Sequence, residues 1–402
     1  MKTICAVGTM DTKGVEFACL KQEIEAMGCA CLTVDCGLFA PVGLTADISA
    51  DETAANAGLS REALVASGDP GAAVVAMSDA AAQTVLSLYC AGRIDGAISM
   101  GGGQGTTVAA KVMSVLPAGF PKVILSTIAL VDKQPFQGIS DTLVMDPIVD
   151  ISGTNALLER ALHNAAAAIC GMAQQPFAAA ADEKPCVAVS MFGITTPCGE
   201  RVCARLREAG YEPLVFHATG VGGAALEKVV RSGSVAGVID MTLTEVGQYD
   251  LGGLSGTVPD RMSAAAECGI PQVLAPGAVD SVNYMAAGGI PTAFQDRLFY
   301  MHNATVALMR TNAEENARIG AEIARRANRA NAPVQVFLPL YGVSAYDRAG
   351  EVFCDPSADA ALFAALESGL REDILCTRLE CHINDPAFAD ALADAMLAML
   401  SK

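Results

Sequence analysis

The chain has 402 residues, of which 52% are hydrophobic and only 17% are charged. This composition excludes a disordered protein, and the length suits two ordinary domains. Acidic side chains outnumber basic ones by 44 to 26, and the chain has no basic run, which argues against a nucleic-acid partner. A net charge of −18 still permits a small anionic ligand, because a nest of backbone N–H groups can hold one.

The first half alternates apolar strands with amphipathic helices. Its opening residues, "TICAVG", predict a strand, and Gly28 is expected to stop the helix that follows. Near-continuous apolar strands that alternate with helices indicate a parallel sheet covered on both faces. Residues 39–90 indicate an added helical segment. We expect strands at 3–8, 29–35, 94–100 and 120–127, and helices at 11–28, 78–93 and 106–113.

Segment 173–185 breaks this rhythm with two prolines and a run of small residues, and indicates a linker. The pattern then restarts, with a weak internal similarity between residues 91–100 and 231–241. We therefore expect an α/β protein of two Rossmann-like doubly wound domains, at residues 1–175 and 186–402, each with a mostly parallel sheet. In the second half we expect strands at 186–193, 211–220, 231–241, 270–277, 297–303, 333–340 and 374–380, and helices at 194–210, 311–330, 356–370 and 385–400. The helix at 311–330 is expected to open with a capping box of Thr311 and Glu314.

Fourteen cysteines are spread along the chain, and no pair has the C-x-x-C spacing. We expect them to be small buried side chains in a reducing compartment, and Cys29, Cys31 and Cys36 lack the second cluster of a zinc site. We expect no membrane-spanning segment, because no apolar stretch reaches the required length, and the N-terminal apolar run is too short for a signal peptide. These patterns predict a soluble, cytoplasmic protein without a membrane partner.

The first strand is followed by the turn "GTMDTKG", from Gly8 to Gly14. Because it opens a helix, its N–H groups carry partial positive charge, and Gly8, Thr9 and Lys13 are candidate nucleotide contacts. Asp11 is a candidate partner for a hydroxyl group or an ion, although the same residues also suit a plain helix cap. The middle glycine of the dinucleotide fingerprint is absent, so Asp35, which ends the next strand, is only a weak ribose candidate.

The stretch "ISMGGGQGTTVAAKVM", residues 98–113, carries the stronger signal. Its glycines let N–H groups approach a phosphate or carboxylate, whereas a tight packing turn is the alternative. No Lys-Ser/Thr pair follows, so the stretch is not a Walker loop. Asp141, Asp146 and Asp150 are candidate Mg²⁺ ligands, with a surface role as the alternative. The candidate anion-binding residues are Gly101, Gly102, Gly103, Gln104, Gly105, Thr106, Ser126 and Thr127.

Polar residues also follow the strands of the second half. Three of the four histidines, His217, His302 and His382, lie at expected strand ends, which makes an acid–base site plausible and a metal site a lesser alternative. A lone histidine, however, is more often a structural donor. Glu245 joins the three histidines as a candidate catalytic residue. The candidate substrate-binding residues are Thr195, Thr196, Thr219, Gly220 and Arg310.

Taken in order, "GTMDTKG", "GRIDGAISMGGGQGTT", "MFGITTPC", "FHATGVGG", "HNATVALMRT" and "CHINDP" closely resemble a family related to the N-terminal domain of the tomato mosaic virus resistance protein. The resemblance covers essentially the whole chain. It implies two Rossmann-like subdomains, a homodimer and ATP binding. The plant relative continues into a barrel-shaped domain, so we do not expect its inhibition of a viral replication protein to carry over.

Together these observations predict a cytoplasmic, homodimeric protein that binds ATP, with Mg²⁺ as a candidate companion. The phosphates would lie on residues 101–107, helped by residues 8–14, and a cleft between the halves would bring a small polar substrate near the histidines. Two alternatives stay open. One is a lyase or hydrolase acting on a small organic acid, and the other is a binding module without catalysis.

Overall fold

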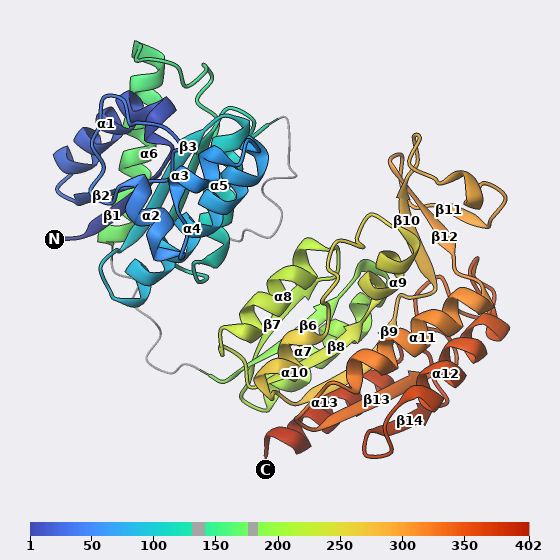
Figure 1. Ribbon diagram of the computed structural model, residues 1–402. Helices are drawn as coiled ribbons and strands as arrows, with labels where there is room; N and C mark the ends of the chain where they lie inside the picture. The colour runs from blue at the N-terminus through green and yellow to red at the C-terminus, as the bar shows by residue number, and fades with distance from the viewer. Residues whose placement is uncertain (131–140, 176–183, 402) are drawn as a thin grey trace. The chain divides into compact units, whose positions relative to one another are not determined.

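A computed structural model describes residues 1–130, 141–175 and 184–401. The chain divides into two compact units, Met1–Ala179 and Ala180–Lys402. Each unit is built on a parallel sheet with helices on both faces (Figure 1), as the alternation of apolar strands and helices predicts.

The N-terminal unit holds a five-stranded parallel sheet in the order β2-β1-β3-β4-β5. Helices α1 and α6 cover one face, where Ile4, Phe17 and Leu162 share a buried cluster. Helices α2, α4 and α5 cover the other face, around Val7 and Val112. The strands are β1 Thr3–Gly8, β2 Ala30–Asp35, β3 Gly96–Gly101, β4 Lys122–Ser126 and β5 Leu143–Met145; the helices are α1 Met10–Ala26, α2 Ala50–Asn56, α3 Arg61–Ala66, α4 Pro70–Cys90, α5 Gly103–Val115 and α6 Ala156–Gln174.

The C-terminal unit has a six-stranded parallel sheet in the order β14-β13-β9-β8-β6-β7. Helices α7 and α13 pack on one face, and α8, α10, α11 and α12 pack on the other. The strands are β6 Cys186–Met191, β7 Glu212–His217, β8 Gly237–Thr242, β9 Gln272–Gly277, β13 Val334–Pro339 and β14 Leu375–Leu379; the helices are α7 Thr196–Glu208, α8 Val221–Arg231, α9 Thr244–Leu251, α10 Ser263–Cys268, α11 Ala313–Ala327, α12 Pro356–Gly369 and α13 Pro386–Leu400.

The two units share a strand order. Strands β6, β7, β8 and β9 occupy the positions that β1, β2, β3 and β4 occupy in the N-terminal unit. The similar stretches 91–100 and 231–241 contain most of β3 and β8, which hold equivalent places. The weak internal similarity therefore coincides with a common topology.

Residues 297–303 contain a strand, as expected, but this strand lies outside the parallel sheet. Their strand, β11 (Phe299–Met301), joins β10 (Ser281–Met285) and β12 (Val306–Arg310) in an antiparallel sheet of order β10-β12-β11. We call this sheet and its connections, residues 281–310, the arm, and Figure 1 shows it standing off the parallel sheet of its own unit.

Two predictions need correction, one on a helix boundary and one on the length of an apolar helix. Helix α11 is capped one residue later than expected, by Asn312 with Glu315, because the Thr311 hydroxyl is buried and donates to the Val279 carbonyl instead. Helix α4, Pro70–Cys90, is long and apolar enough to span a membrane by length and composition alone, which the sequence analysis did not expect. In the fold it packs against α2 and α5 as part of the buried core.

Candidate functional site

The two glycine-containing turns of the N-terminal unit line one pocket. They follow β1 and β3, neighbouring strands from which the chain runs in opposite directions across the sheet. Ligands of open α/β sheets bind beyond the strand ends at such a reversal. The pocket has a volume of about 430 Å³, within the range of small-molecule sites. Its lining residues are Thr9, Asp11, Thr12, Lys13, Cys36, Leu38, Phe39, Pro70, Val74, Gly101, Gly102, Gly103, Gln104, Gly105 and Val108.

The N-terminus of α1 forms one side of the pocket. The N-cap residue Thr9 makes no capping hydrogen bond with its side chain, but the Asp35 carboxylate accepts from the Met10 N–H at the first position of the helix, so only part of the positive charge of this terminus is left for the pocket. The Lys13 ammonium adds a full charge and donates to the Ile151 carbonyl. The Asp11 carboxylate accepts 3.0 Å hydrogen bonds on Oδ2 from the Leu38 and Phe39 N–H groups. Its Oδ1 atom is buried, with no hydrogen-bond partner within the described ranges.

The glycine-rich stretch forms the first turn of α5, and is not the loop before a helix that we expected. Gly102 is the N-cap, without a side-chain cap from any described residue. Gly101 is required by packing, because a Cβ there would lie 2.7 Å from the Gly105 Cα. A Cβ on Gly102 would meet only the Thr127 Oγ1 atom at 3.6 Å, and one on Gly103 would meet nothing within 4 Å. The space over Gly102 and Gly103 is therefore open to the pocket that they line.

Other predicted contacts at this edge differ in their roles. A Cβ on Gly8 would collide with the Phe17 ring, so this glycine serves packing. The Thr9 hydroxyl lies 2.9 Å from that of Thr12, and both residues line the pocket. Gln104 is exposed and lines the pocket. Thr9 and Gln104 are thus placed where a ligand would reach them.

Three predicted ligand residues are engaged within the fold. Asp35 is buried, and its Oδ1 atom accepts from the N–H groups of Met10 and Gly37 at 2.9 and 2.8 Å. Burial raises the pKa of Asp35. The hydroxyl groups of Thr106 and Ser126 are buried and lie 2.7 Å from each other. These groups hold the strand ends in place and do not line the pocket.

The aspartates that follow β4 are dispersed. Asp141 pairs with the buried Lys122 ammonium at 2.8 Å, and Asp146 accepts from the Ile148 N–H. Asp150 is exposed. Across the described ranges, no group of three or more histidine, cysteine, aspartate or glutamate side chains is arranged to hold a metal ion.

One wall of the pocket is apolar, and no sequence motif predicted it. Leu38 and Phe39 follow β2, whereas Pro70 and Val74 belong to the first turns of α4, and Val108 comes from α5. Phe39 is 63% exposed, and its only signal in the sequence is an apolar Leu-Phe pair inside the glycine- and proline-containing stretch "CGLFAPVG". An end that binds anions and an apolar wall together suit a ligand that has both an anionic part and an apolar part.

In the C-terminal unit, Glu245 is buried in a cluster of charges. Its Oε2 atom lies 2.6 Å from Nε of the buried Arg261, which also pairs with Asp240 and Glu227. Its Oε1 atom accepts from the Gly220 N–H, and from a second N–H at the start of α8. The helix terminus that we predicted to bind substrate is therefore occupied by a carboxylate of the same chain.

The predicted threonines of this unit have partners nearby. Thr195 is buried, and its hydroxyl lies 2.8 Å from that of Thr242. The Thr196 hydroxyl donates to the Phe192 carbonyl, and the exposed Thr219 donates to the carbonyl of His217. Their role in substrate binding stays a prediction.

The three strand-end histidines lie on separate elements. His217 is exposed at the end of the edge strand β7, and His302 is exposed on the arm, with Nδ1 3.2 Å from the Tyr346 hydroxyl. His382 is buried after β14; its Nδ1 atom accepts from the Asn384 N–H, and Nε2 contacts the Ser344 carbonyl at 2.8 Å. This bonding is that of a structural histidine with both ring nitrogens engaged.

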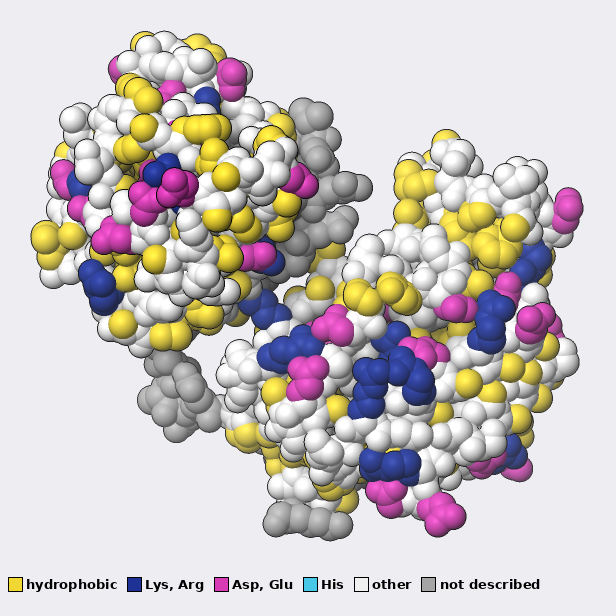
Figure 2. Space-filling view, in the orientation of Figure 1, with side chains coloured by type: hydrophobic (Ala, Val, Ile, Leu, Met, Phe, Trp, Pro, Cys, Tyr) yellow, Lys and Arg dark blue, Asp and Glu magenta, His cyan; other side chains and the backbone are white. Residues whose placement is uncertain are grey.

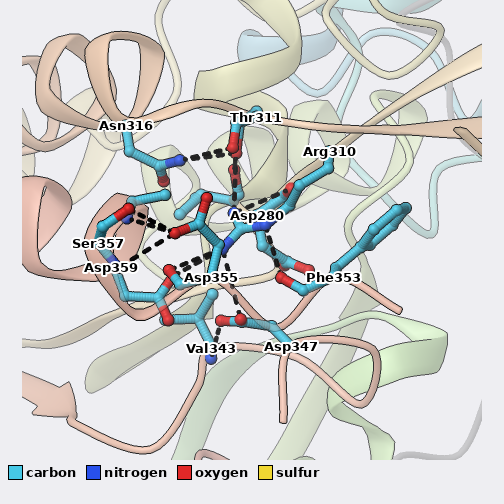
Figure 3. A network of polar contacts seen from close by, with 12 residues as sticks. Asp280, Arg310, Thr311, Asn316, Val343, Asp347, Phe353, Asp355, Ser357 and Asp359 are labelled. Atoms are coloured by element: carbon cyan, nitrogen blue, oxygen red, sulfur yellow. Dashed lines mark hydrogen bonds and ion pairs between the residues drawn. The ribbon is translucent and has the colours of Figure 1, made fainter. Parts of the chain in front are cut away.

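Arg310 is also engaged within the fold. Figure 3 shows its guanidinium among carboxylates, where Nη2 donates to Asp359 at 2.8 Å and Nε donates to the Phe353 carbonyl at 2.7 Å. The side chain is buried. This arginine therefore ties the arm to its own unit, and its predicted contact with a substrate is untested.

Comparison with known proteins gives matches along almost the whole chain. Residues 2–178 and 184–400 match the N-terminal and C-terminal domain models of the uncharacterised protein family UPF0261. A UPF0261 protein of Clostridium tetani is 42% identical over 402 residues, which is 100% of both chains. Another, of Mesorhizobium japonicum, is 43% identical over 395 residues and covers 98% of each chain.

The ToMV resistance protein Tm-1(GCR237) of Solanum lycopersicum is 42% identical over 340 residues, which is 83% of this chain and 45% of that protein. This match confirms the relation to the plant protein that the motifs indicated. Among solved structures, a putative UDP-N-acetylglucosamine 2-epimerase from Listeria monocytogenes aligns over 68% of this chain and 79% of its own. Its 11% identity and TM-score of 0.26 are too low to bear on function.

Proposed function

The chain belongs to the uncharacterised protein family UPF0261, and for this member we propose that the N-terminal unit binds ATP in the pocket between the β1 and β3 turns. The phosphates would lie against Gly102–Gly105. The base would pack on the apolar wall that Leu38, Phe39, Pro70 and Val74 form.

One observation carries this proposal, namely that two helix N-termini line the same pocket, and that the N-terminus of α5 has no side-chain cap from the described residues. An uncapped N-terminus presents a partial charge of about +0.5 to a ligand, whereas at α1 the Asp35 carboxylate offsets part of that charge. The open space over Gly102 and Gly103 lets N–H groups approach phosphate oxygens closely. Lys13 adds a full positive charge to the same lining and balances the Asp11 carboxylate there, so the N–H groups at the start of α5 face a pocket without excess negative charge, although the whole chain is acidic.

Asp11 fits the polar part of a nucleotide other than its phosphates. Its Oδ1 atom is buried and has no partner in the described residues, so it is available to accept from a ribose hydroxyl. A carboxylate oxygen is also a preferred ligand of Mg²⁺, which in nucleotide sites is held by one or two carboxylates and the phosphates. Asp11 is therefore the ribose contact or, as the alternative, a ligand of the ion that accompanies the triphosphate.

The alternative of a lyase or hydrolase acting on an organic acid has less support from this pocket. Its lining residues include Asp11 and Lys13 as charged groups but no histidine. Burial raises the pKa of the third titratable side chain, the Cys36 thiol. The predicted cleft for a second substrate and the roles of His217 and His302 stay predictions, so the proposal is binding, without an assigned reaction.

The test is isothermal titration calorimetry with ATP and Mg²⁺ on the full chain and on the Gly102→Val variant. The added carbons would fill the space over the helix N-terminus while meeting only an ordinary contact with Thr127, so we expect ATP binding to be lost and the melting temperature of the free protein to be kept. Gly193→Val is the control, because Gly193 lies in the turn after β6 in the other unit and also has open space around it. Unchanged ATP affinity in Gly102→Val would refute the site.

Tripolyphosphate separates the two parts of the pocket. If it binds as tightly as ATP, the apolar wall contributes nothing and the pocket is an anion site only. If ATP binds much more tightly, the wall around Phe39 is the base subsite.

A further inference from the structure

The arm of the C-terminal unit is rooted in a buried group of carboxyl side chains. Asp280 immediately precedes β10, and Arg310 ends β12, and these two strands pair with Ser281 opposite Arg310. The first residue of β10 and the last residue of β12 therefore lie side by side at the base of the arm. Asp347 follows β13 and Asp359 lies in the first turn of α12, so the group joins the arm to the body of its unit (Figure 3).

Negative groups outnumber positive ones in this buried group. The residues Asp280, Asp347 and Asp359 are 0%, 1% and 6% exposed, and the guanidinium of Arg310 lies between them. Arg310 directs only Nη2 toward carboxylates, at 2.8 Å from Asp359 and 3.4 Å from Asp347. Three ionised carboxylates would leave two uncompensated charges away from water, which is costly.

The contacts of the three acids indicate which of them suit a proton. Asp280 receives a 2.7 Å bond on Oδ2 from the Ser344 hydroxyl, while its Oδ1 atom is buried without a partner in the described residues. Asp359 and Asp347 share the Arg310 Nη2 atom, so one of the two must hold a proton if a single positive charge is to balance the pair. Neutral Asp280 and neutral Asp359 would leave Asp347 as the one counter-charge to Arg310.

Burial and the neighbouring Asp347 raise the pKa of Asp280 to about 7 and that of Asp359 to about 8, although Arg310 opposes both shifts. Burial also raises the pKa of Asp347. Hydrogen bonds from Ser357 and Ala358 instead lower the pKa of Asp355, which lies beside the group. The titratable, charged and polar groups that face it are Asp347, Asp355, Arg310, Thr311, Asn316, Ser344, Tyr346 and His382.

We propose that protons held by Asp280 and Asp359 fasten the arm to the C-terminal unit, and that the arm loosens when both acids ionise above neutral pH. Each lost proton adds a negative charge that Arg310 cannot balance, and the simplest relief is entry of water at the arm's root. The arm carries an apolar surface, on which Met285, Leu298 and Met301 are 44%, 51% and 55% exposed (Figure 2). Protonation of Asp280 and Asp359 therefore makes the position of this apolar surface depend on pH.

A single tryptophan reports on the arm, because the chain has none of its own. Tyr300, on β11, packs its ring 4.8 Å from that of Tyr346 and 6.4 Å from that of Phe353, so Tyr300→Trp places the probe at the contact between arm and body. We expect the fluorescence maximum of this full-length variant to move to longer wavelength as pH rises from 6 to 9, with a midpoint between about 7 and 8.

The same probe in Asp280→Asn/Asp359→Asn should show no such transition, because an amide has nearly the shape of the neutral acid and does not ionise. Asp296→Asn, an exposed aspartate of the arm, is the matched control and should keep the transition. If the double variant does not fold, each single variant should still shift the midpoint. A probe that does not respond between pH 6 and 9, or an equal transition in the amide variants, would overturn the proposal.

Discussion

Replacement of Glu245 decides between a catalytic and a structural reading of this carboxylate. In Glu245→Gln the carboxamide still accepts from the N–H groups of Gly220 and Gly223, but its NH₂ group faces Nε of Arg261, donor against donor. Breaking one partner of a buried pair costs 3–5 kcal/mol, and we expect about 3 kcal/mol because Asp240 still neutralises Arg261. Glu245→Ala should cost about 2 kcal/mol more, since both N–H groups then lose their acceptor.

The measurement is urea unfolding of the full chain, followed by far-ultraviolet circular dichroism, with Glu212→Gln as the control at an exposed position of the same unit. ATP binding by the N-terminal unit should be unchanged in all three variants. A free energy of unfolding within about 1 kcal/mol of wild type for Glu245→Gln, below the range for a broken buried pair, would refute the structural reading. If a reaction of this protein were lost in that same stable variant, the predicted catalytic role of Glu245 would return.

Three further outcomes follow from the geometry. Lys13→Met should weaken ATP binding about tenfold and reduce its salt dependence, as titration calorimetry at two ionic strengths would show, because one full charge leaves the pocket. His382→Ala should destabilise the chain by about 2 kcal/mol in urea unfolding, since a buried main-chain contact loses its partner, whereas His302→Ala on the exposed arm should cost less than about 0.5 kcal/mol. The raised pKa of Asp280 contributes stability that is complete below pH 4 and is lost as pH rises through about 7, so unfolding free energies at pH 5 and 9 should differ less in Asp280→Asn than in wild type.

Much of the fold follows from local sequence. Strand β1 and helix α1 appear within two residues of their expected bounds, because apolar runs and the Gly28 stop signal involve near neighbours only. The arm was not expected, because an antiparallel strand of three residues has no periodicity that distinguishes β11 from a parallel strand. The N-cap of α11 lies one residue after the predicted position, because Thr311 makes a tertiary hydrogen bond that local sequence rules do not describe.

The candidate site was predictable in part. The glycine turn and Asp11 were identified from their place after a strand, and both line the pocket. Phe39 and Val74 were missed, because they come from the segment between β2 and β3 and reach the pocket only through the packing of α4. The buried carboxyl groups around Arg310 could not be predicted, since they come from segments far apart along the chain, and the predicted contact of Arg310 with a substrate stays a prediction.

The order of strands and helices, and the presence of bare glycines where a strand meets a helix, were properties of the sequence by itself, because they depend on residues a few positions apart. Which two turns share a pocket was decided by the tertiary structure, through the strand order that sets β1 beside β3. Tertiary structure also decided that Glu245 pairs with Arg261 and that Arg310 pairs with Asp359, since folding brings together charged groups that lie far apart along the chain.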